Sequence, residues 1–185
     1  MLASKQQQES FQPNLTPEQI ASFIGSVADY IRAQRASYRP QSAPLAFSEL
    51  WLKFFPQSDL ERIRILPPGQ ERVPNPPFYA DLEKMGFTGL PNFTTMAAIT
   101  FDDTVVFHDA LTPQLIFHEM VHVVQYRLLG IDEFARLYVR GYLHGGYAGT
   151  PLEKCAYDLD GRFIMGSVGF DVEAEVRAWI EGGRF

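Results

Sequence analysis

The order of apolar and polar positions along the chain predicts a series of helices. Three of these helices begin at a Thr-Pro pair, in which the threonine caps the helix and the proline suits its first position. Residues 38–45 and the glycine-rich residues 144–150 are expected to be connections. The expected helices span residues 17–35, 47–55, 113–130, 131–143, 151–164 and 171–181, with one helical turn at 77–85.

Two stretches of the chain favour β-structure instead. Residues 60–66, LERIRIL, alternate apolar and charged positions and predict a strand with one wet face. Residues 97–101 and 104–107 flank two aspartates, which indicates a hairpin, and His108 at its end is expected to be structural or to lie near a cleft mouth. Residues 67–77 hold five prolines and predict an irregular surface loop. The pattern therefore predicts an α+β fold, with a small sheet before a mostly helical C-terminal half.

The helix expected at residues 113–130 carries the motif HEMVH at residues 118–122. On an α-helix, His118 and His122 lie one turn apart on one face, so both imidazoles can reach a single metal ion. Glu119 lies beside the open coordination position, where its carboxylate can hold a water molecule and take its proton. The helix is apolar on nearly every side, which predicts burial, and buried unpaired polar side chains are costly. The segment therefore predicts a zinc site with Glu119 as general base.

Composition and charge narrow the classes of function. The 185 residues suffice for one domain, expected at residues 13–185 behind a disordered start at residues 1–12. The net charge of −6 argues against a nucleic-acid partner, and no basic run suggests an anionic membrane surface. Neither a signal peptide nor a membrane-spanning apolar stretch is expected. Cys155 is the single cysteine, which excludes an internal disulfide. Cytoplasmic residence is the default expectation, with export by another route left open.

A catalytic zinc ion usually takes three protein ligands, so a third ligand is expected outside the motif. The extended motif with a third histidine at position 128 is absent. Glu153 is the best candidate, because it lies in the first turn of a helix, where the helix dipole favours a carboxylate. Ala156 on the same face would let that helix approach the motif helix closely. The alternatives are that Glu153 only stabilises its own helix, or that His144 in the glycine-rich loop is the ligand.

The motif helix and the block PLEKCAYDLDGRF at residues 151–163 together resemble the gluzincin type of zincin metallopeptidase. More narrowly, they are similar to bacterial H-E-x-x-H proteins of largely unknown function, in which the motif continues as HVVQ and a P-L-E-x-x-A-Y block follows. The resemblance covers about residues 95–165. It implies a zincin-like fold, zinc ligation by His118, His122 and Glu153, and Glu119 as general base and acid. It also implies a peptide substrate paired along the edge of the predicted hairpin.

The residues that would orient the ligands or stabilise the reaction are open at this stage. Many gluzincins place an aspartate four residues after the ligand glutamate, where this chain has Tyr157. Asp160 shares a helix face with Glu153 and could orient a histidine instead, as could Asp158. An oxyanion formed during hydrolysis needs a hydrogen-bond donor, and His144 is one candidate. The tyrosine candidates, each with core packing as the alternative, are Tyr142, Tyr147 and Tyr157.

Three functions are consistent with this pattern. The first is a zinc-dependent peptidase, in which zinc polarises the scissile carbonyl and Glu119 activates water. The second is an inactive zinc-binding domain, in which the metal stabilises the fold and a partner binds along the hairpin edge. The third is a zinc hydrolase that acts on a small amide. The sequence predicts neither the substrate specificity nor the oligomeric state.

Overall fold

The computed structural model describes residues 15–46, 48–69, 72–166 and 168–184. The disorder expected for residues 1–12 lies outside this range. Within the described residues, six α-helices and a four-stranded sheet form the fold, which confirms the α+β prediction. The helices after the hairpin confirm the mostly helical C-terminal half.

Side-chain caps define the starts of the two longest helices, as the Thr-Pro pairs predict, whereas the hydroxyl of Thr150 at the third pair donates to the carbonyl of Tyr147 and does not cap its helix. Thr16 accepts a hydrogen bond from the backbone of Gln19, and Thr112 accepts one from the backbone of Leu115. The α-helices are α1 (Pro17–Tyr38), α2 (Gln57–Arg62), α3 (Tyr79–Lys84), α4 (Pro113–Gly145), α5 (Pro151–Ile164) and α6 (Val172–Glu181). The 3-10 turns are η1 (Arg39–Gln41), η2 (Trp51–Lys53), η3 (Phe93–Thr95) and η4 (Tyr147–Gly149).

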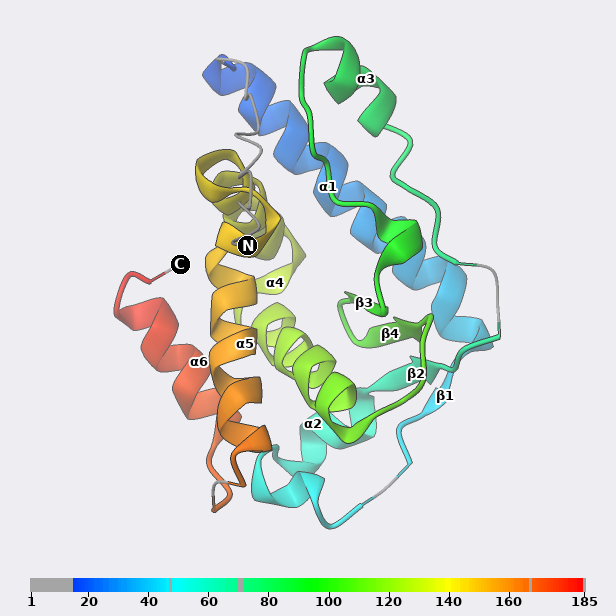
Figure 1. The fold of residues 1–185 in the computed structure, drawn as a ribbon, viewed down its shortest axis with the longest axis vertical. Helices are drawn as coiled ribbons and strands as arrows, with labels where there is room; N and C mark the ends of the chain where they lie inside the picture. Colours follow the sequence, from blue (N-terminus) through cyan, green and yellow to red (C-terminus); the bar gives the residue numbers. More distant parts are fainter. Residues whose placement is uncertain (1–14, 47, 70–71, 167, 185) are drawn as a thin grey trace, which may run out of the picture.

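The sheet is small and mixed, with the strand order β1-β2-β4-β3. Its strands are β1 (Ala43–Pro44), β2 (Arg64–Leu66), β3 (Ala98–Phe101) and β4 (Thr104–Phe107). The predicted hairpin is confirmed, because β3 pairs antiparallel with β4, and Phe101 lies opposite Thr104 across a turn that places Asp102 at φ 58°. The parallel pairing of β2 with β4 joins the hairpin to the preceding segment. Figure 1 shows the sheet on one side of α4, with α5 and α6 on the other.

Two predicted elements are wrong in part. The strand expected at residues 60–66 begins only at Arg64, because α2 occupies the residues before it. The alternation of apolar and charged residues wrongly indicates a strand there. Asp59 is buried and pairs with Arg127 of α4, with Nε and Oδ1 2.8 Å apart, and this pairing holds the residues of α2 as a helical turn against the core. The helix expected at 47–55 is reduced to η2, and residue 47 lies outside the described residues.

Gly130 divides α4 into two helical halves, as the sequence predicts. Its backbone angles, φ 75° and ψ 163°, are strongly disfavoured for residues with a side chain. The helix bends at this kink, and the Phe134 ring stacks on the Tyr126 ring across it, with centroids 3.7 Å apart. The first half of α4 is buried among residues from η2, α2, the sheet, α5 and α6, whereas the second half packs against α1.

The proline-rich loop is fastened to the end of the hairpin by His108. The ring accepts a hydrogen bond at Nε2 from the backbone of Val73, at 2.9 Å, and donates one from Nδ1 to the carbonyl of Met96, at 2.8 Å. Both ring nitrogens therefore serve the backbone, which confirms the structural role expected for this histidine.

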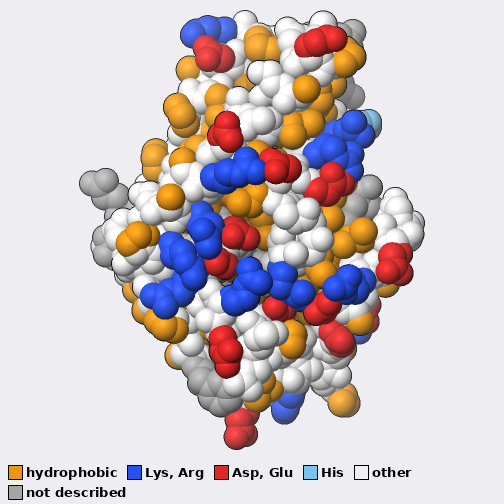
Figure 2. Space-filling model, turned by 180° about the vertical axis from the view of Figure 1, so that it is seen from behind, with side chains coloured by type: hydrophobic (Ala, Val, Ile, Leu, Met, Phe, Trp, Pro, Cys, Tyr) orange, Lys and Arg blue, Asp and Glu red, His pale blue; other side chains and the backbone are white. Residues whose placement is uncertain are grey.

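Charged side chains of both signs intermix on the face shown in Figure 2. Among the described ion pairs, Arg35 of α1 binds Asp103 of the hairpin turn, with Nε and Oδ1 2.9 Å apart. Arg32 binds Asp132 of α4 at 2.7 Å, so charge pairs as well as apolar contacts join α1 to its neighbours. No helix in the described part of the chain is long and apolar enough to cross a membrane.

Candidate metal centre

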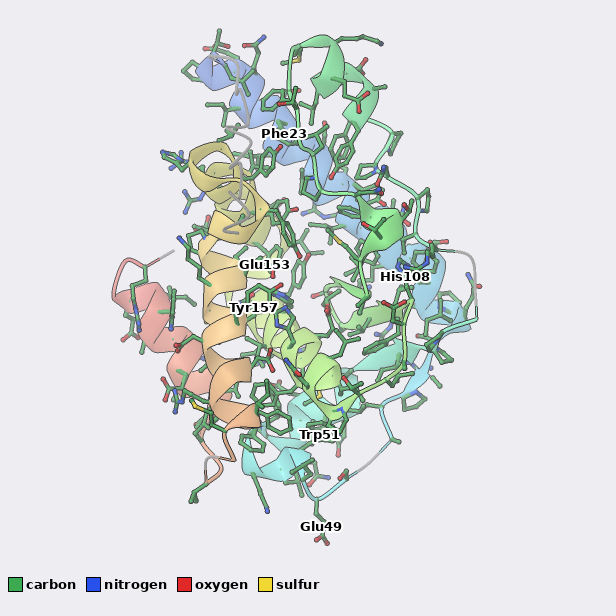
Figure 3. All side chains as sticks on the ribbon, viewed as in Figure 1. Phe23, Glu49, Trp51, His108, Glu153 and Tyr157 are labelled. Atoms are coloured by element: carbon green, nitrogen blue, oxygen red, sulfur yellow. The ribbon has the colours of Figure 1, made fainter. Side chains whose placement is uncertain are left out.

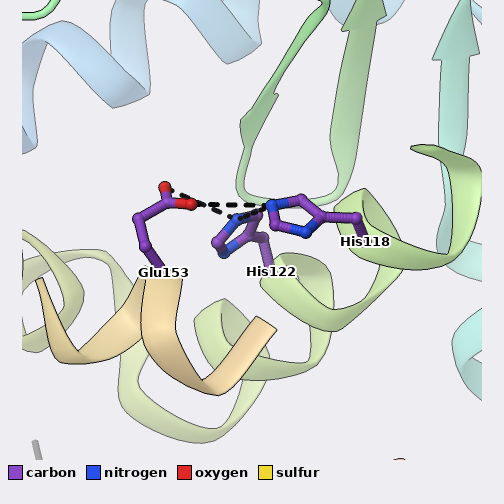
Figure 4. A group of neighbouring side chains, drawn as sticks. All are labelled: His118, His122 and Glu153. Carbon is purple, nitrogen blue, oxygen red and sulfur yellow. Dashed lines mark hydrogen bonds and ion pairs between the residues drawn. The ribbon is translucent and has the colours of Figure 1, made fainter. Parts of the chain in front are cut away.

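His118, His122 and Glu153 converge on one point between α4 and α5 (Figure 4). Helical spacing places the two histidines one turn apart on α4, and Glu153 projects from the first turn of α5. The two Nε2 atoms lie 3.2 Å apart. Glu153 Oε2 lies 3.5 Å from Nε2 of His118, and Oε1 lies 3.7 Å from Nε2 of His122. The structure therefore brings together the three ligands implied by the sequence resemblance.

The spacing of these atoms suits a metal ion. Tetrahedral ligands at roughly 2.0–2.1 Å from a zinc ion lie about 3.4 Å from one another. The three residues are each no more than 8% exposed, so water satisfies their polar atoms poorly. Oε2 of Glu153 is buried and has no hydrogen-bond partner among the described residues. An unsatisfied buried carboxylate oxygen beside two facing imidazole nitrogens is the environment that a cation relieves, so the group could hold a metal ion.

Small residues allow α5 to reach α4. Ala156, one turn after Glu153, is fully buried, as expected for a close helix contact. At the other end of the contact, a Cβ atom at Gly141 would lie only 2.6 Å from Cδ of Pro151. A side chain at Gly141 would therefore push away the start of α5, and with it the turn that carries Glu153.

Gln125 orients His122, although the sequence gives it no role. Its side chain is fully buried, and its amide nitrogen donates to the carbonyl of Leu152 at 3.0 Å. That bond turns the amide oxygen toward Nδ1 of His122, which lies 2.8 Å away and donates to it. With the proton on Nδ1, the Nε2 lone pair points to the other ligands. The spacing of three residues between His122 and Gln125 could have indicated this contact from the sequence. The second partner of Gln125, the carbonyl of Leu152, lies on α5 and could not be predicted from that spacing.

Asp160 lies beside the other histidine. Its Oδ2 is 4.0 Å from Nδ1 of His118, and it accepts a hydrogen bond from the Gln114 amide at 3.1 Å. Asp160 is buried, whereas Asp158 is exposed. Of the two aspartates considered from the sequence, the structure thus places only Asp160 near a ligand.

Glu119 is held next to the ligands but is not one of them. Its Oε2 accepts a hydrogen bond of 2.6 Å from the hydroxyl of Thr100, which belongs to the edge strand β3. The bond anchors Oε2 of the carboxylate, and Oε1 is not engaged by Thr100. Glu119 is buried, and it lines the same cavity as the three ligands. This is the position that a general base requires.

Two of the tyrosine candidates lie close to the ligands. The ring of Tyr157 tilts over that of His118, with centroids 4.7 Å apart, and the residue is 54% exposed, so core packing is the wrong interpretation. Figure 3 shows Tyr157 and Glu153 on the same helix, α5. Tyr147 lines the cavity, where burial and the adjacent Glu153 carboxylate raise the pKa of its hydroxyl well above the ordinary value.

The structure does not bring His144 into this group. Its side chain is exposed, and Nδ1 donates a hydrogen bond to the carbonyl of Arg140, one turn earlier, at 2.7 Å. Tyr142 is buried, and its hydroxyl lies 3.5 Å from the carbonyl of Thr88, consistent with the core-packing alternative.

His122 and Glu153 shift each other's pKa in opposite directions. Burial opposes a proton on His122, but the carboxylates of Glu153 and Glu119 and the hydrogen bond to Gln125 together outweigh it and raise the pKa of His122 to about 9. Burial likewise opposes the charge of Glu153, but the two histidines hold the pKa of this carboxyl far below its ordinary value.

A cavity of about 100 Å³ opens beside the group. All three ligands and Glu119 contribute to its wall, and the rest of the wall is mainly apolar and aromatic. Strand β3, the edge strand of the sheet, borders the same cavity, and its four residues are buried. A peptide paired along β3 remains a prediction.

No match emerged when the chain was compared with models of protein families, with curated proteins and with solved structures. The case for a function therefore depends on the chemistry of the residues themselves.

Proposed function

We propose that this protein is a zinc-dependent metallopeptidase, of the kind that the gluzincin resemblance implies. The observation that carries the proposal is the convergence of two imidazole nitrogens and one carboxylate at distances of 3.2–3.7 Å, with Glu119 next to them on a shared cavity. The ligands would be His118, His122 and Glu153.

The donor set favours zinc over the other common divalent cations. Calcium and magnesium prefer oxygen ligands, whereas zinc readily combines imidazole nitrogen with a carboxylate. Structural zinc sites are usually closed by four protein ligands, but catalytic sites have three and an open position. Only three residues form the group in the described part of the chain. The cavity beside them supports the catalytic interpretation.

The chain supplies the proton transfers of peptide hydrolysis. A bound zinc ion would act as a Lewis acid that polarises the substrate carbonyl and activates water. Glu119 accepts a proton from that water as the oxygen adds to the carbonyl carbon. When the C–N bond breaks, Glu119 delivers the proton to the leaving amine nitrogen. Thr100 holds Oε2 of Glu119, which leaves Oε1 free to carry the proton. Tyr147 and Tyr157 are the nearest candidates for hydrogen bonding to the oxyanion.

An inactive metal-binding domain is the second candidate, and the burial of the group between two helices favours it. A metal ion that joins α4 to α5 would stabilise the fold whether or not it catalyses a reaction. The two functions differ in their need for Glu119, which is not required to bind the metal.

The substitution Glu119→Gln separates the two functions. The variant should bind one zinc ion per chain, as judged by elemental analysis, and should lose about 100- to 10,000-fold in peptide hydrolysis, because the general base is gone. Glu133→Gln is the matched control and should retain full turnover, because Glu133 is a half-buried glutamate of α4 that pairs with Arg136 and does not line the cavity. Unchanged hydrolysis in Glu119→Gln would refute the mechanism. Failure of the zinc-loaded wild type to cleave a broad peptide library would favour the inactive domain.

A further inference from the structure

The cavity beside the metal centre reaches from the ligands to helix α1. Phe23 and Val27 of α1 line it, as do Phe78 in the segment before α3, Phe93 in η3 and Phe134 in α4. Figure 3 shows Phe23 on α1 and Glu153 on α5, two of the helices that wall the cavity. The wall is therefore built from segments far apart in the sequence, and eleven of its 24 described lining residues are phenylalanine or tyrosine.

The wall offers no charge to a ligand away from the metal centre. Among the described residues that line the cavity, there is no lysine, arginine or aspartate, and both glutamates belong to the centre. Several wall residues are tyrosines, but the hydroxyl groups of two of them face backbone carbonyls. The hydroxyl of Tyr30 donates to the carbonyl of Pro74 at 3.0 Å, and the hydroxyl of Tyr142 lies 3.5 Å from the carbonyl of Thr88. These rings present apolar surface to the cavity.

The size of the cavity suits one large side chain. A volume of about 100 Å³ is roughly seven to ten times the 10–15 Å³ that one water molecule needs. The side chain of phenylalanine has about the same number of non-hydrogen atoms, and apolar walls favour its transfer from water. A charged side chain in this position would lose its hydration without gaining a partner.

We infer that this cavity is the specificity pocket of the enzyme, and that it takes a large, uncharged apolar side chain next to the scissile bond. The inference depends on the proposed peptidase function, because only a substrate bound at the metal centre would direct a side chain into the cavity. Val27 of α1 helps to set its size and is distant in sequence from the ligands. The substrate class is therefore peptides with phenylalanine, leucine or a similar residue at one position flanking the cleaved bond.

The first test varies the substrate. A set of quenched fluorescent peptides would carry phenylalanine, leucine, alanine, lysine or aspartate at one position in an otherwise constant sequence of small residues. The zinc-loaded wild type should cleave next to phenylalanine or leucine, with kcat/KM at least about 100-fold higher than next to lysine or aspartate, because burying an unpaired charge is strongly unfavourable. Equal cleavage of all five peptides would overturn the inference and leave the peptidase function standing.

The second test changes the pocket. Val27→Phe should fill part of it and lower kcat/KM for the phenylalanine peptide by at least about ten-fold, while the alanine peptide is affected less. Val27→Ala should enlarge it and favour a tryptophan peptide over the leucine one. Ile24→Phe is the matched control, because Ile24 lies one turn earlier on α1 and packs against the core without lining the cavity. Zinc content and thermal unfolding of each variant would show that it is folded.

A binding measurement separates failure of the pocket from failure of the peptidase function. The same peptides, labelled for fluorescence anisotropy, would be titrated into zinc-loaded Glu119→Gln, which binds without turnover. Preference for the phenylalanine peptide, reduced in a Val27→Phe/Glu119→Gln double variant, would support the pocket even if the wild type cleaved nothing. If the preference for the phenylalanine peptide were the same in the Val27→Phe/Glu119→Gln and Ile24→Phe/Glu119→Gln variants, the pocket would be overturned even if the wild type cleaved peptides.

Discussion

Replacing Gln125 by leucine would test whether this residue sets the protonation and orientation of His122. Leucine has a similar volume, so the fully buried site stays filled. The substitution removes the acceptor 2.8 Å from Nδ1 of His122 and the donor 3.0 Å from the carbonyl of Leu152. The ring of His122 then has no fixed tautomer, and the contact between α4 and the start of α5 loses a hydrogen bond.

The expected magnitude follows from these two bonds. A buried Nδ1–H of His122 without an acceptor costs about 1–3 kcal/mol, and loss of the bond to the Leu152 carbonyl adds about 1 kcal/mol. Gln125→Leu should therefore lower the unfolding free energy of the metal-free protein by about 2–4 kcal/mol. Zinc affinity should fall about 10- to 100-fold, as is typical when the partner of a metal-binding histidine is removed.

Urea unfolding of the metal-free protein and zinc competition with a chromophoric chelator would measure the two effects. Gln125→Glu is the informative control, because a carboxylate still accepts from Nδ1 of His122 but cannot donate to the Leu152 carbonyl. It should recover zinc affinity to within about ten-fold of wild type while remaining less stable, since carboxylates serve as partners of metal-binding histidines. Wild-type zinc affinity in Gln125→Leu would refute the argument that Gln125 prepares the ligand.

Three further predictions concern the metal centre. Glu153→Ala should lower zinc affinity by more than about 100-fold, beyond the loss of an orienting residue, whereas His144→Ala should leave it unchanged; the reverse result in a chelator competition would show that the ligand set is wrong. Although burial opposes it, the Glu153 carboxylate raises the pKa of His122 to about 9, so zinc must displace a proton below that pH. Apparent zinc affinity should therefore rise with pH, level off above about 9, and be accompanied by proton release in calorimetry; affinity independent of pH between 6 and 8 would contradict this. Thr100→Val should reduce kcat roughly ten-fold at constant zinc content, because a hydrogen bond to a charged group is worth about 1.5–3 kcal/mol, and an unchanged kcat would show that Thr100 does not position the base.

Local rules predicted the parts of the centre that depend on one helix. The spacing of His118 and His122 places both rings on one face whenever residues 113–130 are helical, and the Thr-Pro pair and Gly130 define that helix. The position of Glu153 required a contact between two helices. Ala156 indicated that such a contact was feasible, but the sequence does not reveal Gly141, which admits the start of α5.

The errors in the predicted fold have the same origin. Residues 60–66 alternate apolar and charged positions, and such alternation fits a strand as well as a short helix with a buried charge. The arrangement is decided by Arg127, which binds Asp59 from α4, far along the chain. Asp59 thus lies on the side of α2 that faces the core. Sequence patterns assume that charged residues face water, so they do not predict this position.

The pocket was beyond prediction for a different reason. Phe23, Val27 and Tyr30 follow one another at helical spacing, and this pattern correctly indicates the face of α1 that turns inward. Periodicity does not indicate whether another side chain fills the space that this face meets. In the structure the same face packs against the core along part of its length and borders the cavity along another part. The cavity beside the candidate metal centre is bordered by the inward faces of α1 and α4, by β3 and by the residues before it, so only the three-dimensional arrangement of all these segments determines the gap.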